Sequence, residues 1–174
     1  MKTGRFQIYT GNGKGKTTAL IGLSVRVACA GMRVYIGQFM KGQKYSELCI
    51  PDKFPLIEIE QFGTPDFIEP GKKPSPKDID NAHRAYLRIK EVLASGRYDL
   101  VGADEICVAV HMGLLPEKKA IELVRERPEN VELVFTGRYA TETMIEKADL
   151  VTEMREVKHY YNTEKLPARR GIEN

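Results

Sequence analysis

A glycine-rich stretch near the start of the chain, YTGNGKGKTT at residues 9–18, combines residue types that bind phosphate. It stands between the apolar run RFQIY and the helical pattern ALIGLSVRVACAG, and turns in this context direct backbone N–H groups at an anion. Gly15-Lys16-Thr17 matches the end of the Walker A pattern G-x-x-x-x-G-K-S/T, although Thr10 stands where its first glycine belongs. A flexible turn without a ligand is the alternative. Three alternating glycines followed by GKTT favour a phosphate site.

The parts of this loop have separate tasks in phosphate binding. Lys16 places a positive charge on the phosphates, and the Thr17 hydroxyl can complete the coordination shell of Mg²⁺. The helix that we expect to begin near Lys16 adds the positive end of its dipole. The residues predicted to bind the nucleotide are Gly11, Asn12, Gly13, Lys14, Gly15, Lys16, Thr17 and Thr18.

Polar residues also follow three later apolar runs. YDLVGADE ends in Asp104 and Glu105, the form of a Walker B motif whose carboxylates stand opposite the first loop. A solvated strand end is the alternative, and we favour a metal site of Thr17, Asp104 and Glu105. Arg138 follows VELVFTG, where its guanidinium could reach a phosphate or a carboxylate, with a plain surface arginine as the alternative. Lys41 comes at the end of GQFMK, near the same edge.

The composition narrows the class of protein. We expect residues 1–174 to form a single nucleotide-binding domain with a substantial core. The sequence contains no run of about eighteen apolar residues, so we expect no membrane-spanning helix. The first strand begins too close to Met1 for a signal peptide. The net charge of +3 gives no sign of a nucleic-acid partner. Cys29, Cys49 and Cys107 lack a C-x-x-C spacing and are expected to be reduced, mostly buried thiols. These features predict a cytoplasmic protein.

Six short apolar runs predict strands: RFQIY, RVYIGQFM, LIEIEQF, YDLVGADEI, VELVFTG and LVTEMREV. Helical patterns at residues 16–30, 75–95, 116–128 and 140–148 alternate with them. In the longest, Ser75 can cap the first turn, and one buried face is expected at Ile79, Ala82, Tyr86, Ile89, Val92 and Leu93. This alternation predicts an α/β fold, a P-loop NTPase-like (RecA-like) mostly parallel sheet with helices on both faces. Ligands bind such sheets at the carboxyl ends of the strands.

Two further stretches have no regular pattern. GTPDFIEPGKKPSPK is a long loop inside the domain, and long loops of this kind are often functional. The last segment, MREVKHYYNTEKLPARRGIEN, has no apolar periodicity, and we expect a frayed tail that is not helical. His159 receives no chemical role, because a lone histidine is more often structural than catalytic.

Taken together, these motifs resemble the P-loop ATP:corrinoid adenosyltransferases. The resemblance rests on TGNGKGKTTA after the first strand, GMRVYIGQFMKG at the second, the DE of DLVGADEI, VELVFTGR, IEKADLVTEM followed by VKH, and the closing GIE. These motifs follow the order of the family and cover nearly the whole chain. The family transfers the 5′-deoxyadenosyl group of ATP to the Co(I) of a corrinoid, in adenosylcobalamin biosynthesis or corrinoid salvage, so the resemblance implies this activity here.

The resemblance also implies how the site works. In the family, Co(I) attacks the ribose 5′ carbon and triphosphate leaves, held in the loop in the reverse of the usual NTPase orientation. No general base is required, because Co(I) is itself a strong nucleophile. Lys16 and Arg138 are then the catalytic residues, which stabilise the leaving group together with the loop amides and Mg²⁺ or Mn²⁺. ATP, a corrinoid, a flavoprotein or flavodoxin-type reductant and a homodimer belong to the same expectation.

Two departures from the family concern the corrinoid side of the site. Many members carry an N-terminal extension that helps to cover the active site, whereas the first strand here lies almost at Met1. The family also uses bulky aromatic residues to exclude the lower axial ligand of the cobalt, and this chain has no Trp. Phe62 and Phe67, in QFGTPDFIEPG, are the candidates for that role and for corrinoid binding, and either could instead be a core residue.

Three other classes of function share some of these motifs. A P-loop ATPase or kinase acting on another small substrate has the same two motifs, with Glu105 in the position of a water-activating carboxylate. A regulatory module would bind ATP without turnover. A nucleic-acid motor is least favoured, because the chain lacks a second RecA-like half and a strong basic stripe. Triphosphate as the product distinguishes adenosyl transfer from hydrolysis and from phosphoryl transfer.

Overall fold

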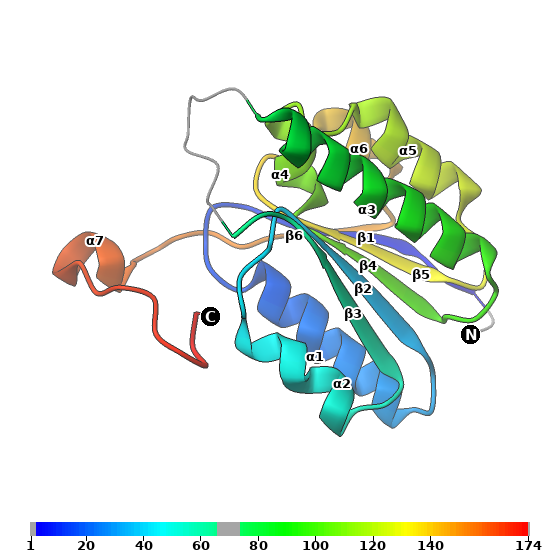
Figure 1. The fold of residues 1–174 in the computed structure, drawn as a ribbon, viewed down its shortest axis with the longest axis horizontal. Coiled ribbons are helices and arrows are strands. Elements are labelled where there is room, and N and C mark those ends of the chain that lie inside the picture. The colour runs from blue at the N-terminus through cyan, green and yellow to red at the C-terminus, as the bar shows by residue number, and fades with distance from the viewer. Residues whose placement is uncertain (1–2, 66–73, 174) are drawn as a thin grey trace.

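The fold is built on a six-stranded parallel sheet, seen in a computed structural model that describes residues 3–65 and 74–173 (Figure 1). The strand order is β3-β2-β4-β5-β1-β6, and every neighbouring pair is parallel. The strands are β1 (Phe6–Thr10), β2 (Val34–Phe39), β3 (Ile57–Phe62), β4 (Leu100–Asp104), β5 (Glu132–Thr136) and β6 (Leu150–Glu153). All six carboxyl ends therefore meet at one edge, as the sequence predicted.

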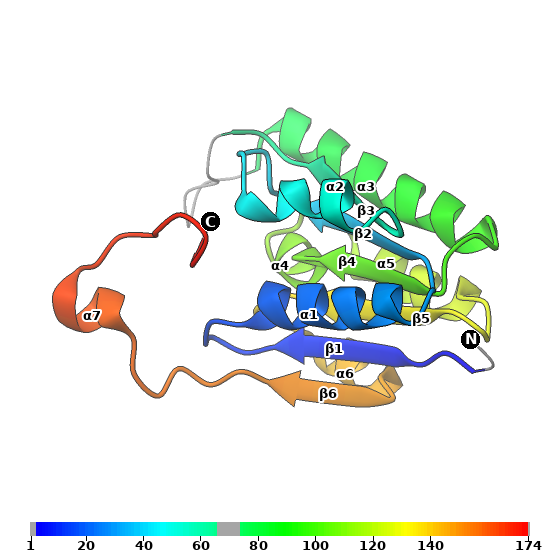
Figure 2. The ribbon, with the colours of Figure 1, turned by 90° about the horizontal axis from the view of Figure 1, so that it is seen from below.

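Helices cover both faces of this sheet (Figures 1 and 2). One face carries α1 (Lys16–Cys29) and α2 (Ile50–Lys53), which follows the short 3₁₀ helix η1 (Ser46–Cys49). The other face carries α3 (Pro76–Ala94), α4 (Ile106–His111), α5 (Glu117–Glu126) and α6 (Glu142–Lys147). A last helix, α7 (Tyr160–Glu164), stands away from the sheet. The predicted α/β architecture is confirmed.

The core consists of two apolar layers, one on each side of the sheet. The smaller layer joins Leu20 and Val27 of α1 to strand residues such as Ile36. The larger layer packs α3, α4 and α5 against the opposite face. Because all five residues of β4 and of β5 are buried, these two central strands are held rigidly between the layers. The loops that follow them are therefore well positioned.

The long helix α3 begins and packs largely as the sequence predicted. The Ser75 hydroxyl accepts a hydrogen bond from the Asp78 backbone N–H, and the Asp78 carboxylate accepts one from the Ser75 N–H, which forms a capping box. The expected face is buried at Ala82, Tyr86, Ile89, Val92 and Leu93. The expectation for Ile79 was wrong, because this residue lies in the first turn and is 45% exposed.

Four short elements were missed by the sequence reading. They are η1, α2, α4 and α7, each of four to six residues, which is too short for a helical period to show. The predicted strand YDLVGADEI also runs too far, because β4 ends at Asp104 and Glu105 adopts a left-handed backbone conformation with φ of 63° before α4.

The described residues allow two expectations to be checked, one about membrane-spanning helices and one about the burial of the cysteines. Within 3–65 and 74–173, no helix combines the length and the apolar character needed to cross a bilayer. Of the three cysteines, Cys107 is buried, whereas Cys29 and Cys49 are exposed. The expectation of mostly buried thiols was therefore wrong, because the ends of α1 and η1, where Cys29 and Cys49 lie, face solvent.

Candidate functional site

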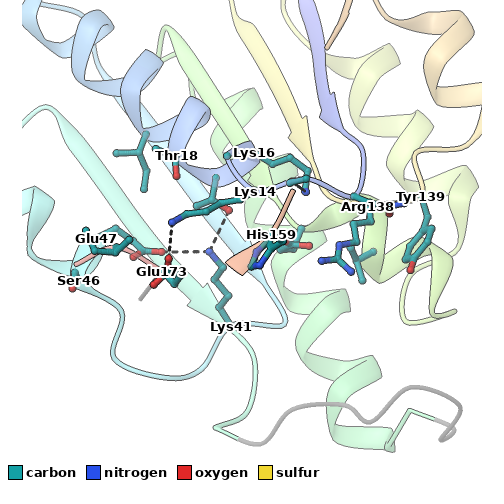
Figure 3. A pocket seen from close by; sticks show the side chains of 18 of the residues that line it. Lys14, Lys16, Thr18, Lys41, Ser46, Glu47, Arg138, Tyr139, His159 and Glu173 are labelled. Atoms are coloured by element: carbon teal, nitrogen blue, oxygen red, sulfur yellow. Dashed lines mark hydrogen bonds and ion pairs between the residues drawn. The ribbon is translucent and has the colours of Figure 1, made fainter. Parts of the chain in front are cut away.

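A pocket of about 1220 Å³ lies at the carboxyl edge of the sheet (Figure 3). Its walls come from the Gly-rich loop, from the segments after β2, β4 and β5, and from the C-terminal segment. Seven of the predicted nucleotide-binding residues line it: Asn12, Gly13, Lys14, Gly15, Lys16, Thr17 and Thr18. Glu105 and Arg138 line it too, so the sequence motifs from three different strands converge on one site.

The Gly-rich loop needs glycine because the chain after β6 packs directly against it. Gly11 and Gly15 have φ of 96° and 122°, values that side chains disfavour. A Cβ on Gly11 would lie 2.5 Å from the Met154 carbonyl oxygen, and one on Gly13 would lie 2.8 Å from the same atom. That carbonyl also accepts a hydrogen bond from the Gly13 N–H at 2.7 Å. Gly11 is thus a structural part of the loop and does not line the pocket.

Lys16 is folded onto the loop from which it projects. Its Nζ donates hydrogen bonds to the carbonyl oxygens of Gly11 at 2.8 Å and Gly13 at 2.7 Å, and only 8% of the residue is exposed. Burial lowers the pKa of this ammonium, and the nearby Glu105 carboxylate opposes that shift. The partners of Lys16 are neutral carbonyl groups, so its full charge is available to an anion that enters the loop.

Asp104 is completely buried, and both of its carboxylate oxygens are occupied. Oδ1 accepts hydrogen bonds from the hydroxyls of Thr17 at 3.0 Å and Thr136 at 2.6 Å. Oδ2 accepts one from the Gln38 amide at 3.1 Å and lies 2.9 Å from the Lys41 ammonium. Four donors therefore converge on this carboxylate, which fixes the Thr17 side chain at the mouth of the loop.

Of the Asp104–Glu105 pair, Glu105 is the residue that lines the pocket. Its left-handed backbone conformation turns the chain directly after β4, and its N–H donates to the Thr136 hydroxyl at 2.9 Å. Burial and then the neighbouring Asp104 charge raise the pKa of the Glu105 carboxyl, while Lys41 and Lys16 oppose the shift. A cation bound next to Glu105 would stabilise the ionised form of this carboxyl.

The donor set fits a magnesium ion that is completed by its ligand. In the described part of the chain, no three or more His, Cys, Asp and Glu side chains cluster as a resident metal site would require. Thr17 and Glu105 are two oxygen donors at the pocket, and Mg²⁺ commonly binds to one or two protein oxygens together with phosphates and water. Asp104 is placed to orient Thr17, since its own oxygens already have four donors.

Residues that the sequence reading did not single out also form the site. Gln38 and Thr136 hold Asp104, and Glu47 lies 3.3 Å from the Lys41 ammonium. Gln38 and Thr136 are polar residues near the carboxyl ends of buried strands, so the rule that drew attention to Asp104 could have found them. Nothing in the sequence pattern marked Glu47, which lies in the short helix η1.

Arg138 and Tyr139 leave β5 on the far side of the pocket (Figure 3). Arg138 is exposed at the pocket wall, and its charge contributes to the lowered pKa of Lys16. The Tyr139 ring stacks on that of His111, with centroids 4.0 Å apart and planes inclined by 24°. The structure thus brings Arg138 to the same site as Lys16, as expected, beside an aromatic pair that was not expected.

The C-terminal segment is an ordered wall of the pocket, and the expectation of a frayed tail without a helix was wrong. It forms α7 and then turns back (Figures 1 and 2), and four of its residues line the pocket: His159, Gly171, Ile172 and Glu173. Its contacts are polar, including an ion pair of 2.9 Å between Lys14 and Glu173, which apolar periodicity could not reveal.

Comparison with known proteins shows the family to which the chain belongs. A family model described as ATP:corrinoid adenosyltransferase BtuR/CobO/CobP matches residues 2–174. The chain belongs to this family. It is 32% identical over 167 residues to the corrinoid adenosyltransferase of Pseudomonas aeruginosa, which covers 95% of this chain and 81% of the relative. The Escherichia coli corrinoid adenosyltransferase is 31% identical over 158 residues, covering 89% and 78%. An uncharacterized Nostoc protein is 32% identical over 185 residues, and this chain spans 48% of its length.

The family transfers an adenosyl group from ATP to a corrinoid. Two aromatic residues, Phe62 and Phe67, were expected near the corrinoid. Phe62 ends β3, is half-buried, and packs against the core on the α3 side. It lines a small cavity with Met40 and Leu114, separate from the large pocket. Phe67 lies outside the described residues. Their roles toward the corrinoid therefore stay predictions.

Proposed function

We propose that this adenosyltransferase uses its Gly-rich loop to hold the triphosphate of ATP as a leaving group. Co(I) of the corrinoid attacks the 5′ carbon, the bond from that carbon to its phosphate oxygen breaks, and the electron pair leaves with the triphosphate. The two electrons of Co(I) form the new cobalt–carbon bond, so the cobalt becomes formally Co(III). The observation that carries the proposal is the convergence of Lys16, Glu105 and Arg138 on one pocket in a chain of this family.

Lys16 stabilises the negative charge that develops on the leaving triphosphate. Its ammonium is buried and lies on two loop carbonyls, so it does not need to reorganise from water when the charge appears. The loop N–H groups and the N-terminus of α1 add partial positive charge at the same place. Arg138, at the opposite wall, supplies a second full charge. No general base takes part, because the nucleophile carries no proton.

Thr17 and Glu105 are the residues that would hold Mg²⁺ or Mn²⁺ between the protein and the phosphates. The ion supplies further positive charge to the phosphate oxygens when it is bound. Asp104 acts through Thr17, whose hydroxyl it holds at 3.0 Å, and through Lys41 at 2.9 Å. The sequence placed both acidic residues at the metal, directly or through water, and this division keeps Glu105 as the closer of the two.

The cellular setting is proposed mainly from the family resemblance. We propose a homodimer in the cytoplasm that receives electrons from a flavoprotein or flavodoxin-type reductant. The exposed apolar side chains of Ile145, Leu150 and Val151, on α6 and the edge strand β6, support a second copy as the partner. Residue 67 and its neighbours in QFGTPDFIEPG remain the proposed corrinoid side of the site.

The decisive experiment identifies both products. The protein is incubated anaerobically with ATP, Mg²⁺ and chemically reduced cob(I)alamin, and the light-sensitive spectrum of the cobalt–carbon bond is followed. The phosphate product is then separated by anion exchange. Adenosyl transfer gives one triphosphate per alkylated cobalt, and the matched control Lys16→Ala gives neither product. Phosphate or ADP without alkylation would instead show an ATPase or kinase. In that alternative, the pocket-lining Glu105 would activate water.

A further inference from the structure

We propose that Glu173 is a positioning residue that ties the C-terminal segment to the Gly-rich loop through Lys14. The tie fixes the outer wall of the pocket against the loop that holds the nucleotide. The proposal rests on the proposed function for the identity of the nucleotide, ATP. It assigns a role to the C-terminal segment, which carries no recognised catalytic motif. It also assigns a role to Lys14, which occupies a variable position of the Walker A pattern.

One carboxylate collects five donors at this point. Glu173 accepts hydrogen bonds from the Lys14 ammonium at 2.9 Å, from the Tyr160 hydroxyl, and from Arg169 through its backbone N–H at 2.8 Å and its guanidinium at 3.1 and 3.3 Å. The Lys14 ammonium also donates to the Tyr160 hydroxyl at 3.3 Å. These donors, with Arg169 foremost, lower the pKa of the Glu173 carboxyl, so it is charged throughout the neutral range.

The cluster joins parts of the chain that are far apart in sequence. Lys14 and Glu173 are separated by 159 positions, and Figure 3 shows their ion pair across the pocket wall. Tyr160 begins α7, so the same carboxylate also closes the turn of the segment back onto itself. The side chain of Glu173 is only 16% exposed, although it stands next to the end of the chain. A frayed terminus would not bury a charge in this way.

The two lysines of the loop therefore have different tasks. Lys16 rests on neutral carbonyl groups and keeps its charge for phosphate, whereas the charge of Lys14 is already paired with Glu173. Gly171 and Ile172, the two residues before Glu173, line the pocket. Releasing Glu173 from Lys14 frees this part of the wall, so the nucleotide loses contacts while the loop keeps its fold.

The test is a charge cycle in the full-length protein. The variants are Glu173→Gln, Lys14→Met and the double variant. Each single change should raise the KM for ATP, and the Kd of ATP by calorimetry without corrinoid, roughly fivefold, as expected for a partly exposed charge-assisted contact. The kcat and the KM for the corrinoid should change little. Glu164→Gln, an exposed carboxylate on the same segment, is the matched control.

The cycle distinguishes a direct Lys14–Glu173 interaction from two independent contributions to ATP binding. The double variant should be no worse than the more affected single variant. Trypsin should cut faster after Lys165 in Glu173→Gln than in the control. Additive losses would overturn the proposal. A Lys14→Met loss far above that of Glu173→Gln would also overturn it, by showing that Lys14 binds phosphate itself.

The ATP titration also distinguishes the two proposals from each other. A parent protein that binds ATP and responds to the cycle, but alkylates no cobalt, would contradict the proposed function and leave the tie supported. A parent that alkylates cobalt, with Glu173→Gln indistinguishable from the control in both affinity and proteolysis, would contradict the tie alone. A parent that binds no ATP would contradict both.

Discussion

Replacing each of the two adjacent acidic residues by its amide should separate a structural carboxylate from a metal-binding one. In Asp104→Asn, the side chain keeps its size and loses its charge. The Lys41 ammonium then lies buried beside a neutral group, with Glu47 at 3.3 Å as its remaining anionic partner. Breaking a buried ion pair costs about 3–5 kcal/mol, and we take the lower end because of Glu47. A loss of about 3 kcal/mol lowers Tm by roughly 6–12 °C in a protein of this size.

Glu105→Gln should behave in the opposite way. Burial and the Asp104 charge raise the pKa of the Glu105 carboxyl in the folded state, so the native protein holds this proton more tightly than the unfolded chain. Stability therefore falls as pH rises from the unfolded pKa through the folded one, and the charged parent carries that penalty at neutral pH. Removing the charge should leave Tm unchanged or slightly higher at neutral pH, and the difference from the parent should vanish in acid.

Thermal unfolding and metal titration together test this separation. Tm is measured from pH 4 to 8 by circular dichroism, and the Mg²⁺ concentration for half-maximal adenosyl transfer is measured for each variant. Glu105→Gln should need more Mg²⁺ by well over tenfold, since it loses a direct ligand. Asp104→Asn should show a smaller rise, as changes behind a ligand do, together with the lower Tm. An Asp104→Asn variant with the parent Tm, or a Glu105→Gln variant with the parent metal requirement, would refute the reasoning.

Three further predictions concern the loop, the thiols and the corrinoid side. Lys16→Ala should abolish adenosyl transfer with an unchanged fold by circular dichroism, and near-normal turnover would contradict the leaving-group role. Burial raises the pKa of the Cys107 thiol to about 12, so Ellman's reagent at pH 8 should titrate only the exposed Cys29 and Cys49 in the native protein. Phe67→Ala should slow the reaction that starts from Co(II) with a flavoprotein reductant much more than the reaction that starts from Co(I); equal losses would indicate packing.

The sheet and the edge that carries the site could be predicted because buried strands and helices have a recognisable periodic pattern of apolar residues in the sequence. Strands β1 to β5 contain buried apolar residues, and α1, α3 and α5 are long enough to show a helical period. β6 is exposed and α6 has only six residues, but the apolar residues of LVTEMREV and ATETMIEKA still indicated these two elements. Because the carboxyl ends of parallel strands meet at one edge, the pattern predicts that the Gly-rich loop, the acidic pair and Arg138 lie together. The loop, Glu105 and Arg138 do line one pocket.

The remaining features depend on tertiary contacts that no local pattern records. The sequence treats Asp104 and Glu105 as one acidic pair, yet the left-handed turn at Glu105 sends one carboxylate into the interior and the other to the pocket. The C-terminal segment looks disordered by composition, because its order comes from polar contacts with a loop at the other end of the chain. The short helices η1, α2, α4 and α7 form where neighbouring elements leave room for them, not where propensity demands them.

The lysines of the pocket show why position matters more than charge. Lys14, Lys16 and Lys41 all line the pocket and contribute equally to the net charge of the sequence. Lys14 is paired with Glu173, and Lys41 is held by Asp104 and Glu47, so each of these charges is largely neutralised within the protein. Lys16 rests on carbonyl dipoles alone. A triphosphate entering the loop therefore draws most of its lysine stabilisation from Lys16, and substitutions at Lys14 or Lys41 should act through the wall and the Asp104 cluster instead.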